Sequence, residues 1–589
     1  MEQTIYIADF ETRAGEQAQK EEKTWVWGWT ITNIMCEEQV WHGSTIKEFF
    51  KFIKKTGNSI IYFHNLKFDG KNILDYLLKN GYNHVRTRKE FKEDKMNFMT
   101  LIDGNGVFYS ITIHNGHRNN IEFRDSFKKA PFSVAKLGKD FNTKYKKTTL
   151  DYVLDRPEGY TPDEDELEYM KNDVRVVAEV LRSFYLKGYD KMTIGSDALN
   201  TYKGMRKTSF FKNHFPQLSG IEDKFVRSAY RGGWCYVNPK YERRTLHENG
   251  NTYDVNSLYP SMLSSTPYVL DGKETVNLYP CYNGIYYTGE YEYDPKMPLY
   301  VCHIKASFVL RDGFLPTIQL KNNHNYRPNE YITATPDGVT VEMYMTNVDY
   351  ELFRKHYELF SIEFIDGYKY VGVSGLFDEY INHFMEIKTT TKGAEKAIAK
   401  LFLNNLYGKF AQAIETQVKI PYLNVEKNKV QYTMSDKEER KPVYVPVGAF
   451  CTAYSRRFTI THAQENYERF CYADTDSIHC VGEAEGLKIH PDNLCCWKHE
   501  STWDSARFLR QKTYMEHIVE EDEKPVDPHW LVKCAGMQQN VKDFFISEIE
   551  SGVKTPDDFD YGLTYDNLKL RPKTVDGGVI LCPTPFTIQ

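Results

Sequence analysis

The feature that most constrains this chain is a pair of aspartates inside an apolar, strand-like run. Residues 469–480 read RFCYADTDSIHC and place Asp474 and Asp476 one residue apart. Burying two like charges side by side is costly, and one carboxyl would normally keep its proton. The run predicts a β-hairpin or strand–turn over residues 470–481. A buried hairpin of this kind needs a positively charged partner that offsets the repulsion between the two carboxylates.

Other acidic residues recur in similarly apolar surroundings. They are Asp9 and Glu11 in IYIADFETR, Asp69 in IIYFHNLKFDG, Asp173 in EYMKNDVRVVAEVL, and Asp254 in TYDVNSLYP. Asp9 and Glu11 are two apart on a predicted strand, so both face the same side. Tyr169 and Asp173 are four apart on one face of a predicted helix. Asp254 ends a predicted strand beside the backbone of Val255.

A single carboxylate of this kind is most often an N-cap, a turn or part of a surface ion pair. Asp69 before Gly70 also fits an Asx-type turn, and Glu11 also fits a strand-edge charge. The whole set favours divalent-metal chemistry, because Mg²⁺ takes oxygen ligands, often carboxylates together with substrate phosphates. Paired metal ions serve phosphoryl transfer. A cation flanked by Asp474 and Asp476 would explain why the two acids tolerate each other.

Composition sets the broad class. The length of 589 residues suggests roughly four domain-sized units. The hydrophobic fraction of 41% and charged fraction of 26% are typical of a soluble globular protein. No apolar run is long enough to span a bilayer, and MEQTIYIADFET does not resemble a signal peptide. The 11 cysteines contain no C-x-x-C pair, which predicts reduced thiols in a cytoplasm-like compartment and no zinc finger.

Positive charge is clustered although the net charge is −6. Residues 127–147 carry seven lysines and one acid, Asp140. Residues 388–400 place four lysines at intervals of four, which predicts a row along one helix face: Lys388, Lys392, Lys396 and Lys400. Such clusters can bind phosphates, and the alternative is a solvated helix face.

The order of the predicted elements indicates an α/β or α+β chain with several modules. Strands are predicted at 4–9, 59–64 and 107–113, a helix at 164–187, a strand over 252–260 that runs into a turn at Pro260, and a long helix at 392–410. Residues 266–376 form a long mixed segment rich in tyrosine.

These segments carry a family resemblance. DFET, FHNLKFDG and YMKND resemble the three motifs of a DEDD-type 3′→5′ exonuclease with a tyrosine before the last aspartate. DVNSLYP, KLFLNNLYGKF and YADTDS resemble the three polymerase motifs of family B DNA polymerases, and all six motifs occur in the family's order. YRGG at 230–233 and KTY at 512–514 also fit. Over essentially the whole chain, the sequence most resembles the protein-primed bacteriophage DNA polymerases.

Three positions depart from the family's pattern. Asn405 stands where the family usually has serine, Ser455 takes a Gly/Ala position, and Phe127 follows Ser126 where leucine is usual. Each substitution keeps a plausible size or polarity, so the departures bear on fine tuning rather than on activity.

The resemblance implies an RNase H-like 3′→5′ exonuclease domain followed by a right-hand family B polymerase with two insertions. The expected parts are the exonuclease domain at 1–193, the palm at 194–265 and 445–534, a terminal-protein-binding insertion at 266–375, fingers at 376–411, a second insertion for processivity and strand displacement at 412–444, and a thumb at 535–589.

For the polymerase site, the resemblance implies two Mg²⁺ ions, with Mn²⁺ as the alternative. The expected metal ligands are Asp254, Asp476 and the Val255 carbonyl, with Asp474 close by. The expected nucleotide contacts are Tyr259 as the gate against ribose, Lys388, Lys400, Asn404 and Tyr407. The expected template and primer contacts are Tyr230, Gly232, Gly233, Thr452, Arg456, Lys512 and Tyr514.

For the exonuclease site, the resemblance implies a second pair of metal ions held by Asp9, Glu11, Asp69 and Asp173. Tyr169 is expected to orient the attacking water, and Lys147 to assist catalysis. The expected contacts to single-stranded DNA are His64, Asn65, Phe68, Ser126 and Phe127. Core packing is the alternative for the two phenylalanines.

The implied partners are template-primer DNA, single-stranded DNA, dNTPs and a phage terminal protein whose hydroxyl serves as primer. Asp349 in NVDYELFRKHY is the candidate contact to that protein. The chain is expected to act as a monomer in the host cytoplasm, without a membrane. The rival hypotheses are a nuclease with a degenerate polymerase half and a non-enzymatic DNA-binding scaffold. Intact Asp254, Lys400, Asp474 and Asp476 oppose the first, and the four exonuclease acids oppose the second.

Overall fold

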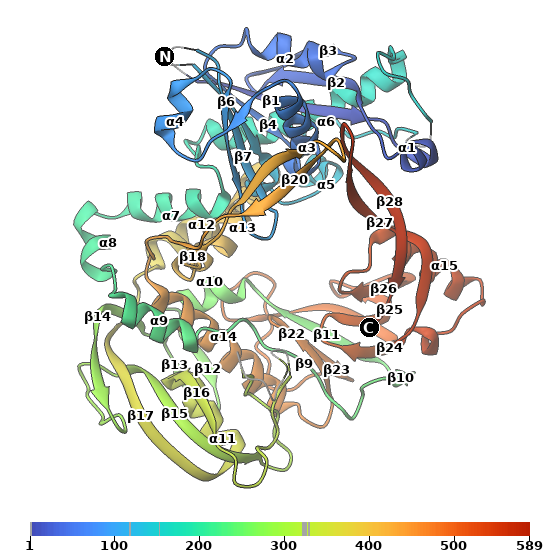
Figure 1. The fold of residues 1–589 in the computed structure, drawn as a ribbon. Coiled ribbons are helices and arrows are strands. Elements are labelled where there is room, and N and C mark those ends of the chain that lie inside the picture. The colour runs from blue at the N-terminus through green and yellow to red at the C-terminus, as the bar shows by residue number, and fades with distance from the viewer. Residues whose placement is uncertain (1–2, 117–118, 152–153, 321–326, 328–329) are drawn as a thin grey trace.

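The computed structural model describes residues 3–116, 119–151, 154–320, 327 and 330–589. Two large sheets carry the acidic motifs, one within residues 4–125 and the other within residues 235–534, and smaller sheets lie around them (Figure 1). Among the described residues, no helix is long and apolar enough to cross a membrane.

The N-terminal sheet has the strand order β3-β2-β1-β4-β8-β7-β6-β5. Its strands are β1 (Thr4–Thr12), β2 (Val26–Asn33), β3 (Cys36–Gly43), β4 (Ser59–Phe63), β5 (Asn83–His84), β6 (Asn97–Ile102), β7 (Phe108–His114) and β8 (Asn120–Asp125). β4 pairs in parallel with β1 and β8, and every residue of its SIIYF run is buried. A continuous apolar strand of this kind is typical of a sheet that is covered on both faces.

Helices cover this sheet and bring the acidic residues to it. They are α1 (Gly15–Glu21), α2 (Ile46–Ile53), α3 (Leu66–Lys79), α4 (Arg88–Glu93), α5 (Val134–Asp140) and α6 (Glu164–Tyr185), with a 3₁₀ turn at Ser126–Lys128. α6 begins with a capping box between Asp163 and Glu166, and its first turn is acidic. Its buried face includes Tyr169 and Asp173 and packs on β1 and β2.

The second large sheet has the order β26-β25-β24-β11-β23-β22-β9, and β10 pairs with β24. Its strands are β9 (Cys235–Val237), β10 (Thr245–Leu246), β11 (Gly250–Val255), β22 (Phe470–Asp474), β23 (Ser477–Val481), β24 (Trp497–Arg510), β25 (Thr513–Glu521) and β26 (Lys524–Cys534). β11 lies between β23 and β24, so strands far apart in sequence meet at the carboxylates.

The central helix of the remaining chain is α14 (Val445–Glu465), which is buried along almost its whole length. α9 (Gly220–Ala229), α10 (Leu258–Leu263) and α13 (Gly393–Phe410) pack against α14, while α7 (Ile194–Met205) and α12 (Asp378–Thr390) pack against α13, and α8 (Thr208–His214) packs against α7. α14 therefore lies at the centre of this core.

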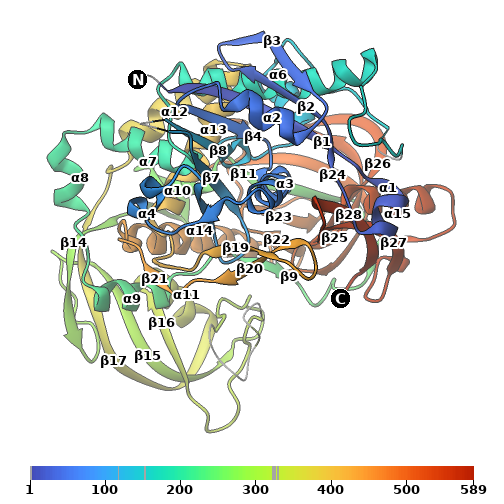
Figure 2. The ribbon, with the colours of Figure 1, turned by 45° about the horizontal axis from the view of Figure 1, so that its top comes forward.

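Two further units interrupt this core. The first is a four-stranded sheet in the order β14-β17-β15-β16, with α11 (Asn347–His356) on one face and its own apolar cluster. Its strands are β14 (Tyr279–Thr288), β15 (Leu299–Leu310), β16 (Val341–Thr346) and β17 (Tyr357–Val373), after a small hairpin of β12 (Tyr268–Leu270) and β13 (Lys273–Thr275). This four-stranded sheet is also separate from the other sheets in the view turned by 45° (Figure 2).

The second unit is a pair of two-stranded ribbons. They are β18 (Glu415–Thr416) with β21 (Glu438–Glu439), and β19 (Lys419–Asn424) with β20 (Lys429–Met434). The β19–β20 ribbon packs against α3, and β20 also contacts β27.

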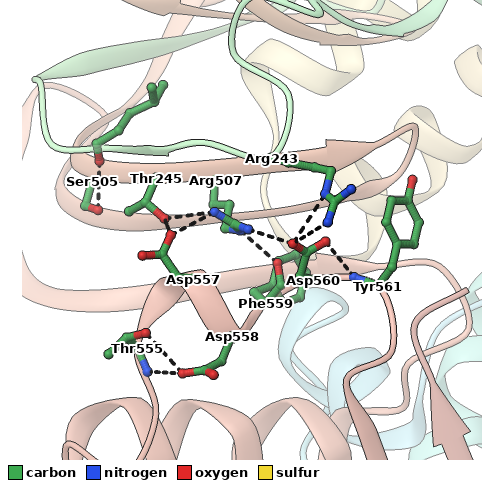
Figure 3. A network of polar contacts seen from close by, with 11 residues as sticks. Arg243, Thr245, Ser505, Arg507, Thr555, Asp557, Asp558, Phe559, Asp560 and Tyr561 are labelled. Carbon is green, nitrogen blue, oxygen red and sulfur yellow. Dashed lines mark hydrogen bonds and ion pairs between the residues drawn. The ribbon is translucent and has the colours of Figure 1, made fainter.

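The C-terminal unit comprises α15 (Gln539–Glu550), the 3₁₀ turn Pro556–Asp558, β27 (Thr564–Val575) and β28 (Gly578–Thr587). A polar network fixes its base to the second large sheet (Figure 3). The buried Arg507 guanidinium donates to Asp557 at 2.9 Å, to Asp560 at 3.0 Å and to the Phe559 carbonyl at 2.9 Å. Arg243 adds a hydrogen bond of 3.0 Å to Asp560.

The far end of the β27–β28 ribbon reaches the N-terminal domain. The backbone of Asp576 bonds to Thr24 and Glu22 at 2.9 and 3.1 Å, and its carboxylate accepts from Lys79. A Cβ at Gly577 would lie 1.9 Å from the Thr24 carbonyl, so only glycine allows this approach. The ribbon therefore bridges the two halves of the chain.

Most of the predicted elements are confirmed. β1, β4 and β7 match the three predicted strands, α6 and α13 match the two predicted helices, and β22 and β23 form the predicted hairpin. The strand predicted over 252–260 is wrong in its second half, because β11 ends at Val255 and Pro260 lies inside α10. Proline fits there, since the first turn of a helix leaves backbone N–H groups unbonded in any case.

Two local interpretations of the sequence are also corrected. Asp69 is in the first turn of α3 rather than in an Asx turn after a strand. The four lysines at 388–400 do not share one helix, because Lys388 is in α12 while Lys392 is the N-cap of α13. Lys396 and Lys400 nevertheless lie close enough to Lys388 to lower the pKa of its ammonium group, after the larger effect of burial.

Two candidate active sites

The first candidate site lies where β11 meets the β22–β23 hairpin. Asp254 pairs with Ser477 across the two strands, and the Val255 N–H donates to the Asp476 carbonyl at 2.8 Å. Thr475 forms the turn of the hairpin with φ +67°, a left-handed conformation that is uncommon for a β-branched residue. The register thus brings Asp254, Asp474 and Asp476 to one end of the sheet.

The two hairpin aspartates have different surroundings. Asp474 Oδ1 accepts from Lys512 Nζ at 2.9 Å and from the Cys235 thiol at 2.9 Å. Burial opposes ionisation of Asp474, but the Cys235 and Lys512 contacts together hold its pKa below the usual value. The repulsion between Asp474 and Asp476 is therefore offset at Asp474 by Lys512, from the turn between β24 and β25, and by the Cys235 thiol of β9.

Within the described part of the chain, no lysine or thiol side chain is hydrogen-bonded to the carboxylate of Asp254 or Asp476. Burial, followed by the charges of Asp476 and Glu500, raises the pKa of Asp254 to about 8. Burial is also the largest influence on Asp476, whose pKa rises to about 6 with Asp474 and Glu500 contributing. Two acids whose pKa values are raised by burial and by neighbouring carboxylates are groups that a divalent cation would return to the ionised form.

These residues fit Mg²⁺ as part of a shared shell. Among the described residues, no three His, Cys, Asp or Glu side chains enclose a metal by themselves. Mg²⁺ is commonly bound by one or two carboxylates and completed by water and substrate phosphates. Asp254, Asp476 and the Val255 carbonyl would supply such an incomplete, oxygen-only set.

Glu500 and Cys235 belong to this site but were missed by the sequence analysis. Glu500 is the extra residue of a β-bulge, because Thr252 pairs with Ser501 and Tyr253 with His499. A bulge re-aims a side chain, and here the Glu500 charge acts on both Asp254 and Asp476. Cys235 comes from β9, which pairs with β22. Neither position carries a local sequence signal, since both depend on long-range strand pairing.

The nucleotide-side residues lie on α10, α12 and α13. The Tyr259 ring stacks on Tyr407 at a centroid distance of 4.0 Å and an interplanar angle of 25°. Lys388 Nζ donates to Ser257 Oγ at 2.9 Å, which holds it beside the segment that follows Asp254. Lys400 and Asn404 are exposed on α13, on the same helix as Tyr407. The predicted nucleotide contacts therefore converge from three elements.

Several residues predicted to contact template and primer lie around the β22–β23 hairpin. Gly233 packs against Thr475, where a Cβ would lie 2.6 Å from the threonine side chain. Lys512 bonds to Asp474, and the Tyr514 ring packs at 4.9 Å from Tyr472. Tyr230 is half-buried and packs against the main apolar cluster. A Cβ at Gly232 would meet no atom within 4 Å.

The structure corrects the expected roles of Arg456, Thr452 and Asp349. Arg456 is buried, and its guanidinium is held by both Asp349 oxygens and by the carbonyls of Arg231 and Gly232. Asp349 is 7% exposed, so this carboxylate is an internal partner and not a surface contact for another protein. Thr452 is also buried, with its hydroxyl bonded to the Gly448 carbonyl of its own helix. Arg456 and Asp349 therefore form an internal ion pair that supports the YRGG segment.

The second candidate site is a cavity of about 640 Å³ in the N-terminal domain. Asp9 and Glu11 enter from β1, Asp69 from α3 and Asp173 from α6. Burial, followed by the charge of Asp173, raises the pKa of Asp9 to about 7. Burial also raises the pKa of Glu11 and Asp69, and Asp9 is the next influence on each. All four predicted acids therefore meet in one cavity.

Lys147 and Tyr169 complete this cluster as predicted. Lys147 Nζ donates to the Tyr169 hydroxyl at 2.9 Å and forms an ion pair with Asp173. The Lys147 ammonium is thus shared between a carboxylate and a phenol at the cavity wall. Four like charges with one lysine leave an excess of negative charge that fits divalent cations.

The expected single-stranded DNA contacts fall into two groups. His64, Asn65 and Phe68 line the cavity. Ser126 does not, because it is buried with its hydroxyl bonded to His64 Nδ1 and to the Phe63 carbonyl. Phe127 is 36% exposed and lies 5.5 Å from the His64 ring, at the surface beside the cavity. Ser126 therefore positions the His64 ring beside the cavity, and its contact to single-stranded DNA stays a prediction.

The cavity has a wall that the sequence analysis missed. Leu570, Val579, Ile580 and Leu581 of the β27–β28 ribbon line it together with the N-terminal acids. These residues are more than 380 positions from the nearest of the other lining residues, and their apolar character alone gives no sign of such a role.

Comparison with known proteins decides the family. A family model described as DNA polymerase type B, organellar and viral, matches residues 53–162 and 154–492. The DNA polymerase of Bacillus phage phi29 is 37% identical over 100% of both chains, and that of Streptococcus phage Cp-1 is 32% identical over 99% of this chain and 98% of its own. The chain belongs to the type B DNA polymerases.

The solved structures agree with this assignment. Phi29 DNA polymerase complexed with primer-template DNA and incoming nucleotide substrates superposes with a TM-score of 0.89 at 36% identity, over 100% of both chains. The same polymerase complexed with single-stranded DNA gives 0.89 at 35% identity, again over 100% of both chains. The predicted fold, an exonuclease domain followed by a right-hand polymerase with two insertions, is confirmed.

Proposed function

We propose that this chain is a DNA-directed DNA polymerase with a proofreading 3′→5′ exonuclease, primed by DNA or by a terminal protein, and able to displace a strand. The observation that carries the proposal is the presence of two separate carboxylate clusters, one on each large sheet. The similar phi29 polymerase has been solved with primer-template DNA and nucleotides, which are the partners proposed here.

In the polymerase site, Asp254, Asp476 and the Val255 carbonyl would hold Mg²⁺. The bound ions would lower the pKa of the primer hydroxyl and neutralise charge on the phosphates. Lys388 and Lys400 would attract the triphosphate, and Lys512 would fix Asp474 and the adjoining primer end. The other contribution of the chain is to align the primer hydroxyl with the triphosphate, because phosphoryl transfer depends mainly on positioning and charge stabilisation.

In the exonuclease site, Asp9, Glu11, Asp69 and Asp173 would hold the cations. Tyr169, steadied by Lys147, would orient the attacking water toward the terminal phosphate. Phe68 would stack on an unpaired base at the frayed 3′ end. The apolar wall from β27–β28 would exclude bulk water from the same cavity.

The further partners follow from the layout of the chain. The four-stranded sheet at 279–373 is the proposed surface for the terminal protein, with contacts other than the buried Asp349. We place the monomeric enzyme in the host cytoplasm, where phage DNA is copied.

Primer extension on a single-primed circular template tests this function. With Mg²⁺ and dNTPs, products longer than the circle are expected, because synthesis would continue by displacing the strand ahead. With the metal omitted, no extension is expected. A chain that binds the primed circle but adds no nucleotide under any divalent metal would be the DNA-binding scaffold instead. Transfer of a deoxynucleotide to a cognate terminal protein tests the priming step separately.

The β19–β20 ribbon provides a prediction about processivity. Glu22 receives Lys573 of β27 at 2.7 Å and Lys429 of β20 at 3.9 Å, so the ribbon, the N-terminal domain and the C-terminal unit meet at one point. We propose that these contacts close a ring around the template, which would restrain DNA by topology rather than by contact energy. Replacing residues 415–440 by a short glycine linker is expected to shorten rolling-circle products at least tenfold at a low enzyme-to-DNA ratio, on the order of the effect that linked binding sites give.

Single-nucleotide addition on a gapped template is the control for that deletion. It is expected to remain, because the deleted ribbon contributes no residue to either carboxylate cluster. Unchanged product length in the deletion variant would show that the ring has no role in processivity.

A further inference from the structure

A histidine and a glutamate form a buried pair in the second large sheet. His479 Nδ1 lies 2.6 Å from Glu516 Oε1, and each of the two residues is only 1% exposed. The Thr252 hydroxyl donates to the same carboxylate oxygen at 3.3 Å and lies 3.1 Å from the same ring nitrogen. Three strands, β11, β23 and β25, therefore meet at one set of directional contacts.

The pair lies on the face of the sheet that carries the polymerase acids. Ser477 of β23 pairs with Asp254 on one side and with Asp474 on the other. His479 is two residues further along β23, so its side chain points to the same face as that of Ser477. The His479 Nε2 atom lies 3.4 Å from the Ser477 hydroxyl oxygen. The buried pair is thus one step along the strand from the acids.

Contact between His479 and Glu516 requires a curled sheet. β23 and β25 are not neighbours, because β11 and β24 lie between them in the strand order. In a flat sheet, three steps of about 4.8 Å would separate the two backbones by roughly 14 Å, too far for the side chains to meet. The pair therefore holds β25 against β23 across the inner face of the curl.

The same curl places Lys512 beside the polymerase acids. Lys512 is in the turn between β24 and β25, where its backbone N–H donates to the Tyr472 hydroxyl and its ammonium group to Asp474, both at 2.9 Å. The rings of Tyr472 and Tyr514 each pack on the His479 ring at a centroid distance of 5.1 Å. Apolar packing is non-directional, whereas hydrogen bonds fix distance and angle, so the buried pair sets where the turn lies.

Stability does not account for this pair. The side chains around it form an apolar cluster that includes Tyr472, Phe508 and Tyr514. Removing a carboxylate and an imidazole from water is costly, and well-packed apolar residues of similar volume often stabilise a core as well or better. A fully bonded polar group in such a core gives it a defined geometry instead.

We propose that His479 and Glu516 are positioning residues for nucleotide addition. Their bond sets the curl of the sheet, and the curl sets the place of Lys512 against Asp474 and the primer end. The inference rests on the proposed polymerase function and adds to it two residues that touch neither metal, nucleotide nor DNA, because both are buried.

Replacing both partners separates this role from stability. His479→Phe with Glu516→Leu removes the bond and leaves apolar side chains in its place. We expect the midpoint of thermal unfolding to stay or rise, and the single-turnover rate of adding one dNTP to a primer to fall by about tenfold to a hundredfold. The apparent Kd for the dNTP should change far less, because Tyr259, Lys388 and Lys400 come from α10, α12 and α13.

A double-mutant cycle with Lys512→Met tests the route. If the pair acts through Lys512, removing the pair from the Lys512→Met enzyme should lower the rate little further. A fall that adds in full to that of Lys512→Met would overturn the proposal, and so would a wild-type rate in the folded double variant.

Glu516→Gln keeps the shape of the side chain and removes the charge that strengthens the hydrogen bond. It is expected to lower the rate several-fold, and again not in the Lys512→Met background. If the double variant does not fold, Glu516→Gln decides the matter, and an unchanged rate in it would overturn the proposal.

A second histidine–carboxylate pair provides the matched control. His517 follows Glu516 on β25, points to the opposite face of the sheet, and lies 2.7 Å from Asp504 of β24. Both residues are partly exposed, and His517→Phe with Asp504→Leu is expected to keep the rate. An equal fall in this control would overturn the assignment to the inner face.

Two further readouts separate the proposal from the proposed function. Digestion of a 5′-labelled single strand should be unchanged in every variant, because the exonuclease acids lie in the N-terminal domain. A wild type that adds no nucleotide would contradict the polymerase function itself, whereas the positioning role is contradicted only beside an active wild type.

Discussion

Replacing Asp9 and Asp69 together by alanine is expected to abolish 3′ digestion and to leave dNTP incorporation intact. Both carboxylates are buried in the same cavity of the N-terminal domain, where they repel each other and Glu11. Without them the remaining acids cannot hold two cations, so hydrolysis should fall on the order of a thousandfold or more, as when members of a catalytic unit are removed. Degradation of a 5′-labelled single strand and single-nucleotide addition to a primer measure the two activities separately.

The variant should fold, which makes the result interpretable. Removing buried like charges relieves repulsion, so the midpoint of thermal unfolding is not expected to fall because of electrostatics. The reciprocal variant, Asp254→Asn with Asp476→Asn, is expected to lose incorporation and to keep digestion. Loss of both activities in either folded variant would rule out two independent sites.

The sequence predicts the acids of both sites because each belongs to a short local pattern. Asp9 and Glu11 alternate on one strand, Tyr169 and Asp173 share a helix face, and the turn between Asp474 and Asp476 is local. Local patterns of this kind survive without knowledge of tertiary contacts. The long helix at 393–410 is predicted for the same reason.

The remaining residues of the sites depend on pairings that no local pattern encodes. Glu500 reaches the polymerase carboxylates through a bulge in the pairing of β24 with β11. Leu581 reaches the N-terminal carboxylate cavity because the β27–β28 ribbon crosses to the N-terminal domain. Arg456 and Asp349 each look like surface contacts in sequence, yet they neutralise each other inside the protein. A charged residue gives no sign in the sequence of whether its partner is a ligand or another side chain.

Replacing Tyr259 by valine is expected to raise ribonucleotide incorporation relative to deoxynucleotides by about a hundredfold, the scale on which a pocket discriminates by shape. The Tyr259 ring is stacked on Tyr407 and cannot swing aside without losing that contact. A fixed ring at this position excludes an added 2′-hydroxyl by collision, and valine would open that space while remaining apolar.

The kinetic form of the change distinguishes a gate from general damage. A relieved collision should appear mainly as a lower apparent Kd for rNTPs, with the rate and affinity for dNTPs changed far less, because the carboxylates, Lys388 and Lys400 are untouched. Tyr259→Phe is the matched control: it keeps the ring and its stacking on Tyr407, so it should keep discrimination against rNTPs. Single-turnover incorporation of one dNTP and of the corresponding rNTP measures both constants. If the constants for the two sugars shift in parallel in Tyr259→Val, the ring positions the nucleotide as a whole and does not select its sugar.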